Sequence, residues 1–584
     1  MKWPRSFNFC TFPIMSALLL VLWNAVPASA QQGVDSSSGV VDDWTHHHVF
    51  FSDPGTLTDA MMNGRREEWQ NIVNEPRYRL QLMKRGAAFR EETRDSAPPD
   101  SEDTNGDSSL SRDWNVTVAS AGASVALGMY PAKYTFAPVA TPSCTNDFVV
   151  FPVSSAGSAT RANIIGVNNL YKTTCTGTVP TVLFAYYVGT GRIRTSPVLS
   201  LDGTKVAFVE SRSSGASIFH VLKLDKSGNS GCPNATPCNG TAYNGPPAVP
   251  GTHNGAVDTK VAFSGTGNIN VTRSSPFVDY THDVAYVGDN TGVLHKFTGV
   301  FTGTPAEVTT SPWPLTVASG VTLTGPTYDS VSGNIFVGGS DGNLYCVTSA
   351  GAFCSTKSIA VGNGSGAAGA ILDAPIVDST RHTVFAIANN ASDAILSQST
   401  TSLGSQVKVI IGKRGNSLYD GAFDNLYFTS VGTGHMYVCG NAVTGTATPT
   451  LWRVGFNSNG TIDTANDGTS FTLAGAAVNC SPMTEVYNST QGKDYLFLGL
   501  SGSGFTSGTH NCGGTACLIS FVLPTSGNSV PTAANATMTS TYVGTTGPSG
   551  IIVDNISGTN GASQTYFGAP TLNLGVQASQ SALQ

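Results

Sequence analysis

Six acidic residues occupy one position of a recurring sequence pattern, three residues after a leading proline or its equivalent. If these positions surround an axis, their carboxylates could hold Ca²⁺, which takes several oxygen ligands. An aspartate at the end of a strand also commonly accepts hydrogen bonds from the backbone of the following turn. Both interpretations stay open for the six residues, which are Asp279, Asp329, Asp378, Asp424, Glu485 and Asp554.

Three consecutive histidines, His46, His47 and His48, offer imidazole nitrogens, which are common metal ligands. Consecutive residues point in different directions in both helices and strands. The run therefore lacks chelating geometry, and we expect it to be a solvated segment.

Other catalytic arrangements find little support in the sequence. No G-x-S-x-G precedes a helical stretch, and "GNGSGAAG" (362–369) is typical of a loop. A glycosidase needs two acids that face one cleft, and no pattern brings together any two of Glu210, Glu307 and Glu485. Catalytic residues are therefore unassigned, and the sequence favours a protein that is not an enzyme.

The cysteines predict a disulfide framework. Eleven cysteines minus Cys10, which precedes an expected cleavage site, leave ten, an even number. A zinc site would need clustered ligands, and no C-x-x-C pair occurs. Spacing alone does not determine the connectivity, but it suggests that neighbours pair: Cys144–Cys175, Cys232–Cys238, Cys346–Cys354, Cys439–Cys480 and Cys512–Cys517.

The first 30 residues predict export. Lys2 and Arg5 precede a short apolar run, and Ala28-Ser29-Ala30 is typical of a signal-peptidase site. We expect cleavage after Ala30, no later transmembrane segment, and a secreted, periplasmic or cell-surface protein. The net charge of −7, with 11% charged residues, argues against a nucleic-acid partner, because phosphate binding needs clustered Lys and Arg.

The mature chain divides into three parts. Residues 31–90 predict a small helical leader, with two helices separated at Pro76 because proline breaks a helix interior. Residues 91–112 are acidic and almost free of large apolar side chains, which predicts a disordered linker. Residues 113–584 form the main domain.

This domain repeats a unit of four short strands, which is typical of the blades of an all-β propeller. Turns such as "GDNTG" (288–292) and "GGSDG" (338–342) carry the Asn, Asp and Gly that tight hairpins require. "DWNVTVAS" (113–120) resembles a fourth strand, so we expect it to close the ring by pairing with the last blade. Eight blades are expected, with seven as the alternative, from the leading positions Pro138, Pro197, Pro276, Pro326, Pro375, Gly421, Pro482 and Ile551.

The units around 275–297, 325–347 and 373–390 resemble repeats of the quinoprotein (PQQ) and YVTN-type propeller superfamily. The chain is also similar to uncharacterised secreted proteins of environmental bacteria, particularly Acidobacteria, through stretches such as "TSPVLSLDGTKVAFVES" (195–211) and "GHMYVCGN" (434–441). This resemblance implies a fold and a compartment but no catalytic residues. A PQQ dehydrogenase typically carries a tryptophan in many blades, whereas only Trp114, Trp313 and Trp452 lie in this domain.

The expected function is that of a secreted binding module that recognises an extracellular protein, a glycan or a small ligand. Binding would use the central channel or long loops, of which 225–256, 456–470 and 501–517 are the longest. The alternative is a metal-assisted hydrolase or lyase that uses the channel carboxylates, with Ca²⁺ as the one cofactor considered. A third possibility is an envelope protein tethered by its leader, which predicts that truncation before residue 112 releases the domain from cells and leaves it folded.

Overall fold

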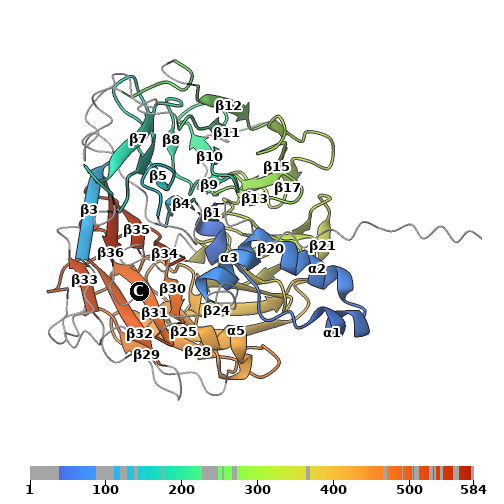
Figure 1. The fold of residues 1–584 in the computed structure, drawn as a ribbon. Helices are drawn as coiled ribbons and strands as arrows, with labels where there is room; N and C mark the ends of the chain where they lie inside the picture. The colour runs from blue at the N-terminus through green and yellow to red at the C-terminus, as the bar shows by residue number, and fades with distance from the viewer. Residues whose placement is uncertain are drawn as a thin grey trace, which may run out of the picture. The chain divides into compact units, whose positions relative to one another are not determined.

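In the computed structural model, eight small sheets follow one another along the chain and surround a central channel (Figure 1). All described residues belong to one structural unit, Ser36–Gln584. The structure describes residues 39–86, 111–118, 128–136, 142–171, 175–177, 179–226, 247–252, 255–265, 273–363, 369–464, 470–489, 491–502, 504, 512–524, 531, 535–539, 543–556 and 564–579.

Each sheet is one blade, built from strands that run antiparallel from the channel outward. The innermost strands are β4 (Ala132–Thr135), β9 (Val198–Leu199), β13 (Phe277–Asp279), β18 (Thr327–Asp329), β22 (Ile376–Asp378), β26 (Ala422–Phe423), β30 (Thr484–Asn488) and β34 (Ile552–Asp554). The second strands are β5 (Phe148–Pro152), β10 (Lys205–Ser211), β14 (Val284–Gly288), β19 (Asn334–Gly338), β23 (Thr383–Asn389), β27 (His435–Asn441), β31 (Lys493–Leu500) and β35 (Gln564–Ala569).

The outer half of each blade is less regular. The third strands are β6 (Ile164–Asn168), β11 (Ile218–Lys223), β15 (Val293–Thr298), β20 (Asn343–Thr348), β24 (Asp393–Thr400), β28 (Pro449–Gly455), β32 (Cys517–Leu523) and β36 (Leu574–Ser579). The outermost strands are β7 (Thr181–Tyr186), β12 (Val257–Ala262), β16 (Ala306–Glu307) with β17 (Leu315–Thr316), β21 (Phe353–Ala360), β25 (Gln406–Lys413), β29 (Ser470–Thr472), β33 (Asn535–Thr539) and β3 (Ser111–Thr117). Additional elements are β8 (Arg192–Ile193) in the second blade, and helix α5 (Asn425–Thr429) and the 3₁₀-helix η3 (Val431–Thr433) in the sixth.

The ring closes where the chain's two ends meet. Innermost strands of neighbouring blades contact each other at most of the junctions, and β34 of the last blade contacts β4 of the first. β3 pairs antiparallel with β36, so "DWNVTVAS" contributes the outermost strand of the eighth blade (Figure 1). The expected propeller of eight blades is confirmed, and the seven-bladed alternative is wrong.

The first blade begins earlier in the chain than the repeat alignment predicts. Its innermost strand follows Pro131, whereas the alignment placed the leading position at Pro138, which lies outside the described residues. The reason is the connection from Phe136 to Asp147, which is longer than the Tyr280–Asp283 turn at the same place in the third blade. The alignment therefore selected Pro138, the proline nearer in sequence to the second strand, and not Pro131, which precedes β4.

The tight turns have the chemistry that their sequences predict. In "GDNTG" the Asp289 carboxylate accepts hydrogen bonds from the backbone N–H of Thr291 and Val293, both at 2.8 Å. Gly292 has a φ of 91°, and a Cβ at this position would lie 1.6 Å from the carbonyl oxygen of Ala318. Only glycine fits this turn, because a side chain would meet backbone that cannot move aside.

The first part of the leader (residues 39–86), namely residues 39–52, lies within the ring and fills one part of the channel. β1 (Val40–Asp42) pairs antiparallel with β4 of the first blade, and β2 (Val49–Phe50) pairs in parallel with β22 of the fifth. The 3₁₀-helix η1 (Trp44–His47) lies between them. Trp44 is 2% exposed and belongs to the same hydrophobic core as residues of the blades. In Figure 1 the leader, in blue, lies between the green and the orange blades.

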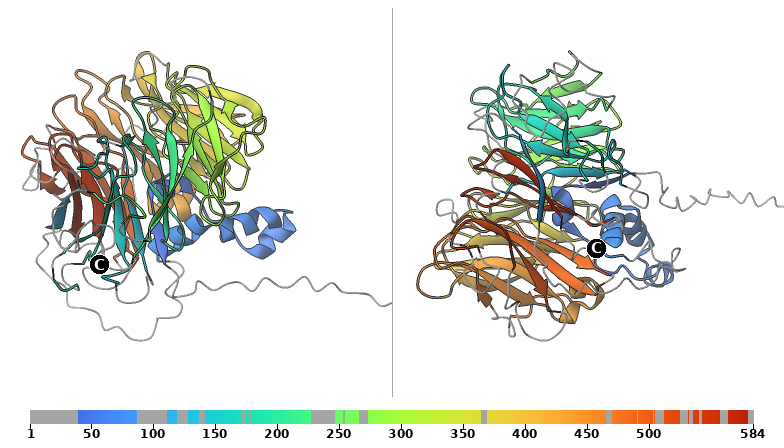
Figure 2. Two further views of the ribbon diagram at one scale, coloured as in Figure 1. Left: turned by 90° about the horizontal axis from the view of Figure 1, so that it is seen from above. Right: turned by 60° about the vertical axis from the view of Figure 1, so that its left-hand side comes forward.

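Three helices complete the leader, one more than the sequence predicts: α1 (Leu57–Met62), α2 (Arg66–Asn74) and α3 (Pro76–Lys84). Pro76 is the first residue of α3, a position where its missing N–H costs nothing. Figure 2 shows the three helices on one face of the ring of blades. No described helix is long and apolar enough to cross a membrane.

Four disulfides reinforce the blades, and all are among the five pairs suggested by spacing: Cys144–Cys175, Cys346–Cys354, Cys439–Cys480 and Cys512–Cys517. Cys232 and Cys238 lie outside the described residues, as does most of the 225–256 insertion. Structural disulfides are typical of proteins that fold in an oxidising compartment.

The second and third blades each contain a buried histidine between two carboxylates. His295 lies 2.6 Å from Glu307 through Nδ1 and 3.4 Å from Asp289 through Nε2. Burial alone would lower the pKa of His295, but the two carboxylates outweigh it and raise the pKa. His220 lies between Glu210 and Asp258, and these two carboxylates likewise raise its pKa against the effect of burial.

This arrangement predicts how stability depends on pH. A histidine whose pKa is higher in the folded state stabilises fully below its unfolded pKa, about 6.5, and this contribution is lost as pH rises through the folded value. We expect the free energy of unfolding, measured with urea, to fall above about pH 6.5. His295→Gln should flatten that fall by up to about 1.4 kcal/mol per pH unit.

His382→Gln is the control for this experiment, because the His382 side chain is 46% exposed. It should leave the slope unchanged. Parallel pH profiles for His295→Gln and the parent protein would contradict the prediction.

A candidate ligand site at the mouth of the central channel

A hollow of about 590 Å³ opens at one end of the central channel. Residues two or three positions before an innermost strand line it, from the second blade to the sixth: Ser196, Ser275, Gly325, Ala374 and Tyr419. Trp44 of the leader and Tyr130 of the first blade add two aromatic side chains. The wall is therefore assembled from rigid strand ends, which suits a preformed binding site.

Two arginines, Arg194 and Arg273, line this hollow. Burial lowers the pKa of Arg194, and the charges of Arg192 and Arg273 lower it further, so three guanidinium groups lie near one another. Arg65, Arg77, Arg85 and Arg381 form ion pairs with described acids. Neither arginine of the hollow is neutralised in this way, which leaves positive charge for an anion.

His48, Asp373 and Asp420 meet at the inner end of the hollow. Nε2 of His48 contacts Oδ2 of Asp420 and lies 3.5 Å from Oδ1 of Asp373. The exposed fractions of their side chains are 0% for His48, 6% for Asp420 and 16% for Asp373, which lines the hollow. Among the described residues, these three side chains form a group of potential metal ligands whose donor atoms all lie within 4.8 Å of one another.

Burial and the charges of the three side chains both shift the pKa values of this group. Burial and the charge of Asp373 raise the pKa of Asp420 to about 7, although His48 acts in the opposite direction. Burial lowers the pKa of His48, but the two carboxylates outweigh it and raise this pKa to about 10. Burial and the same carboxylates raise the pKa of Tyr130 well above its ordinary value, so its hydroxyl lies within their influence.

Five of the six carboxylates of the repeat lie at, or directly after, the other end of the innermost strands, whereas Glu485 is the second residue of β30. Most accept a backbone hydrogen bond from the turn that follows: Asp279 from Thr281, Asp329 from Val331, Asp378 from Thr380, Asp424 from Tyr427 and Asp554 from Ile556. These contacts agree with the turn interpretation. The calcium ring stays a prediction.

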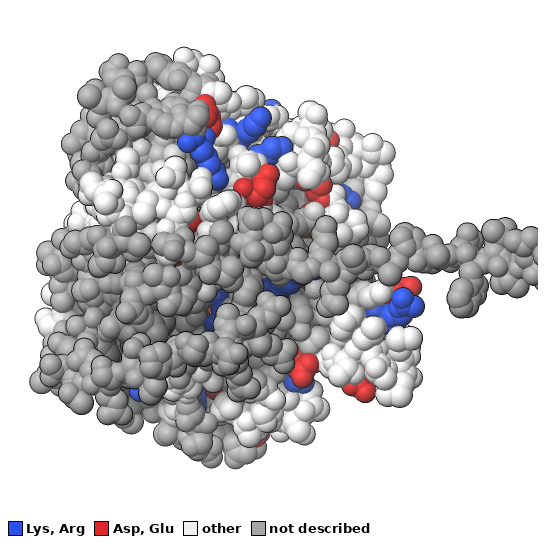
Figure 3. Space-filling view, in the orientation of Figure 1, with Lys and Arg blue, Asp and Glu red and all other residues white. Residues whose placement is uncertain are grey.

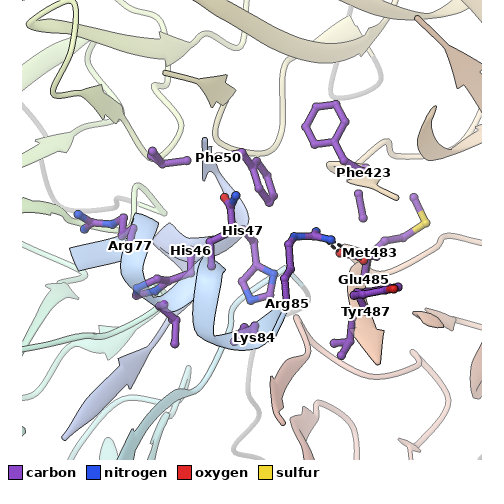
Figure 4. Close-up of a pocket in the computed structure, with 16 residues that line it drawn as sticks. His46, His47, Phe50, Arg77, Lys84, Arg85, Phe423, Met483, Glu485 and Tyr487 are labelled. Atoms are coloured by element: carbon purple, nitrogen blue, oxygen red, sulfur yellow. Dashed lines mark hydrogen bonds and ion pairs between the residues drawn. The ribbon is translucent and has the colours of Figure 1, made fainter. Parts of the chain in front are cut away.

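Cationic and hydroxyl side chains also reach these carboxylates. Arg85 Nη2 of the leader lies 2.7 Å from Glu485 Oε2, and the Ser52 hydroxyl donates to Asp378. Lys133 of β4 lies 2.7 Å from Asp554. Figure 4 shows Arg85 directed at Glu485 beside a cavity of about 60 Å³ that α3 shares with the sixth and seventh blades. The leader occupies this end of the channel.

The expectation of a solvated histidine run is wrong. His46 and His48 have side chains that are 7% and 0% exposed, and the His47 ring stacks on Tyr130 at 4.9 Å. The cause is η1, which turns the three rings toward different protein surfaces.

Sequence reasoning also missed Asp373 and Asp420. The available signal was their placement, since each acid comes one or two residues before the leading position of its blade. The regular acids of the repeat follow that position, so the pattern does not mark these two.

Comparisons with known proteins add little. No protein-family model matches the chain, and no curated protein does. A solved structure of Sqt1 from Chaetomium thermophilum is 11% identical with a TM-score of 0.47, covering 80% of this chain and 99% of that one. BamB from Moraxella catarrhalis is 12% identical with a TM-score of 0.39, covering 80% and 97%. Such distant similarity carries no argument about function, and membership of the quinoprotein or YVTN-type repeats stays a prediction.

Proposed function

We propose that this protein is an exported β-propeller binding module that takes a small anionic ligand in the hollow at the channel mouth. The observation that carries the proposal is a pair of arginines, Arg194 and Arg273, on the wall of a preformed hollow, which form no ion pair with an acid among the described residues. Aromatic side chains beside them offer an apolar surface to a ring.

Three features support this assignment. The four disulfides fit the export expected from the N-terminal sequence. Strand ends from five blades hold the wall in place, so little ordering is needed on binding. Charged side chains are sparse on the described part of the face in Figure 3, as the composition requires. An extracellular glycan with acidic sugars is the kind of partner from which such a ligand would come.

The test uses a uronic acid, its uncharged parent sugar and inorganic phosphate as calorimetric probes. We expect at least one anion to bind and the neutral sugar to bind more weakly. Arg194→Ala with Arg273→Ala should weaken anion binding by at least about 10-fold, because hydrogen bonds to charged groups contribute about 1.5–3 kcal/mol each.

Lys357→Ala with Lys408→Ala is the matched control. It removes the same charge from the outermost strands β21 and β25, and should leave binding unchanged. Failure of every anion to bind, or equal losses in both double variants, would contradict the proposal.

A further inference from the structure

We propose that His48, Asp373 and Asp420 bind one Zn²⁺ ion, with a coordination position open to the hollow. Zinc takes imidazole nitrogen and carboxylate oxygen ligands at about 2.0–2.2 Å, and sites that bind a further ligand keep one position free. The three donor atoms already lie within 4.8 Å of one another, so small side-chain movements complete the site.

The hydrogen bonding of His48 directs Nε2 at the two carboxylates. Nδ1 lies 2.8 Å from the carbonyl oxygen of Trp44, and a carbonyl can only accept, so Nδ1 carries a proton. A metal ion that displaces the proton of Nε2 would meet the lone pair of this nitrogen and both carboxylates together. A backbone carbonyl that holds the other ring nitrogen is the usual support of a metal-binding histidine.

Comparison with His220 and His295 separates this group from an ordinary ion pair. Each of those rings places one carboxylate at each nitrogen, which is how an imidazolium uses its two N–H groups. His48 instead presents both carboxylates to one nitrogen. That convergence suits a single ion shared by three donors.

The charges of a filled site would balance. A neutral imidazole, two carboxylates and a divalent cation sum to zero, as a buried place requires.

The hydroxyl of Tyr130, a residue that is 1% exposed, has no hydrogen-bond partner among the described residues. The Tyr130 hydroxyl can donate to a water on the ion. The Asp373 carboxylate is held in place by the backbone N–H of Ala374 at 3.0 Å and of Asp420 at 3.4 Å.

The ion site stands whether or not the hollow binds an anion. If the proposed function also holds, a bound ion would remove the negative charge at the inner end and favour the same anionic ligand. That last step rests on the proposed function, whereas the metal measurement does not.

The experiment measures Zn²⁺ alone, by elemental analysis and calorimetry, on the whole exported chain after chelator treatment and refilling. We expect one Zn²⁺ per chain. His48→Gln and Asp420→Asn should each weaken binding by more than about 100-fold, since loss of a mere supporting group costs about 10–100-fold. Asp373→Asn, at the more exposed wall of the hollow, gives the same test if a buried variant fails to fold.

His295→Gln is the matched control, because it removes a buried histidine that also contacts two carboxylates. It should retain the ion. Substoichiometric zinc in the refilled parent protein would overturn the proposal and show that a proton neutralises the group. Equal zinc binding by Asp373→Asn and the parent would also overturn it, whatever the result with anions.

Discussion

Replacement of Arg77 by methionine is expected to lower the free energy of unfolding by about 3–5 kcal/mol, the cost of leaving a buried ion without its partner. Arg77 lies in α3 and is 3% exposed, and its Nη1 lies 2.8 Å from Oε1 of Glu75, which is 6% exposed. Methionine would preserve much of the apolar contact while leaving this carboxylate unpaired.

The same guanidinium connects the leader to the third blade. It donates to the Thr45 hydroxyl and to the carbonyl oxygen of Val278, each at 2.8 Å. It also lies over the rings of Phe277 and Tyr280, at 4.5 and 4.7 Å from their centroids. One substitution therefore removes bonds both within the leader and between the leader and the channel wall.

Chemical denaturation of the two proteins measures this effect. Arg65→Met is the control, because the Arg65 side chain is 45% exposed and its pair with Glu68 should contribute less than about 1 kcal/mol. Glu75→Gln combined with Arg77→Met should recover part of the loss, since no buried charge then remains unpaired. Equal losses for Arg65→Met and Arg77→Met would show that burial does not strengthen the Arg77 pair.

The ring of blades could be predicted because its information is local and repeated. One hairpin is specified by a short run of Val, Ile, Phe and Tyr, a Gly-containing turn and another such run. This pattern recurs often enough for the blades to be counted. The Gly421 unit aligned poorly for a physical reason. Its innermost strand β26 has two residues, and Asp424 then begins helix α5 by accepting from the backbone N–H of Tyr427. The blade therefore has all four strands although its sequence departs from the repeat.

The position of the leader could not be predicted, because its partners lie far away in sequence. Trp44 Nε1 donates to the carbonyl oxygen of Pro276, and Arg85 reaches Glu485 across 400 residues. Helical periodicity shows that a segment has an apolar face, but it does not show what covers that face. The His48 group was missed for the same reason, since its three members come from the leader and two different blades.

The leader's position leads to the second large expected effect. A chain that starts at Ser111, the first residue of β3, should fail to fold cooperatively. It would lose the buried side chains Trp44, Val49, Phe51 and Ile72 from the largest hydrophobic core. Each such side chain contributes about 1.5–3 kcal/mol, and a typical domain has only about 5–15 kcal/mol in total.

Lost charge pairing adds to this apolar loss. Without Arg85, the buried Glu485 loses its cationic partner, and without Ser52, Asp378 loses a hydroxyl donor. Two blades would also lose a paired strand, since β1 lies against β4 and β2 against β22. These contacts therefore predict that removal of the leader unfolds the domain. The hypothesis of a removable tether predicts the opposite.

The measurement compares thermal unfolding of three chains, which start at residue 1, at Ser36 and at Ser111. The chain from Ser36 keeps every described contact of the leader and should unfold as the full chain does, whereas the chain from Ser111 should show no cooperative transition. Adding residues 36–90 as a separate polypeptide should restore a transition, because pairing with β4 and β22 needs proximity and not a peptide bond. If the Ser111 chain unfolded cooperatively at the temperature of the full chain, the leader would be an accessory bound to a ring that folds independently, and the His48 group would not be part of the folded core.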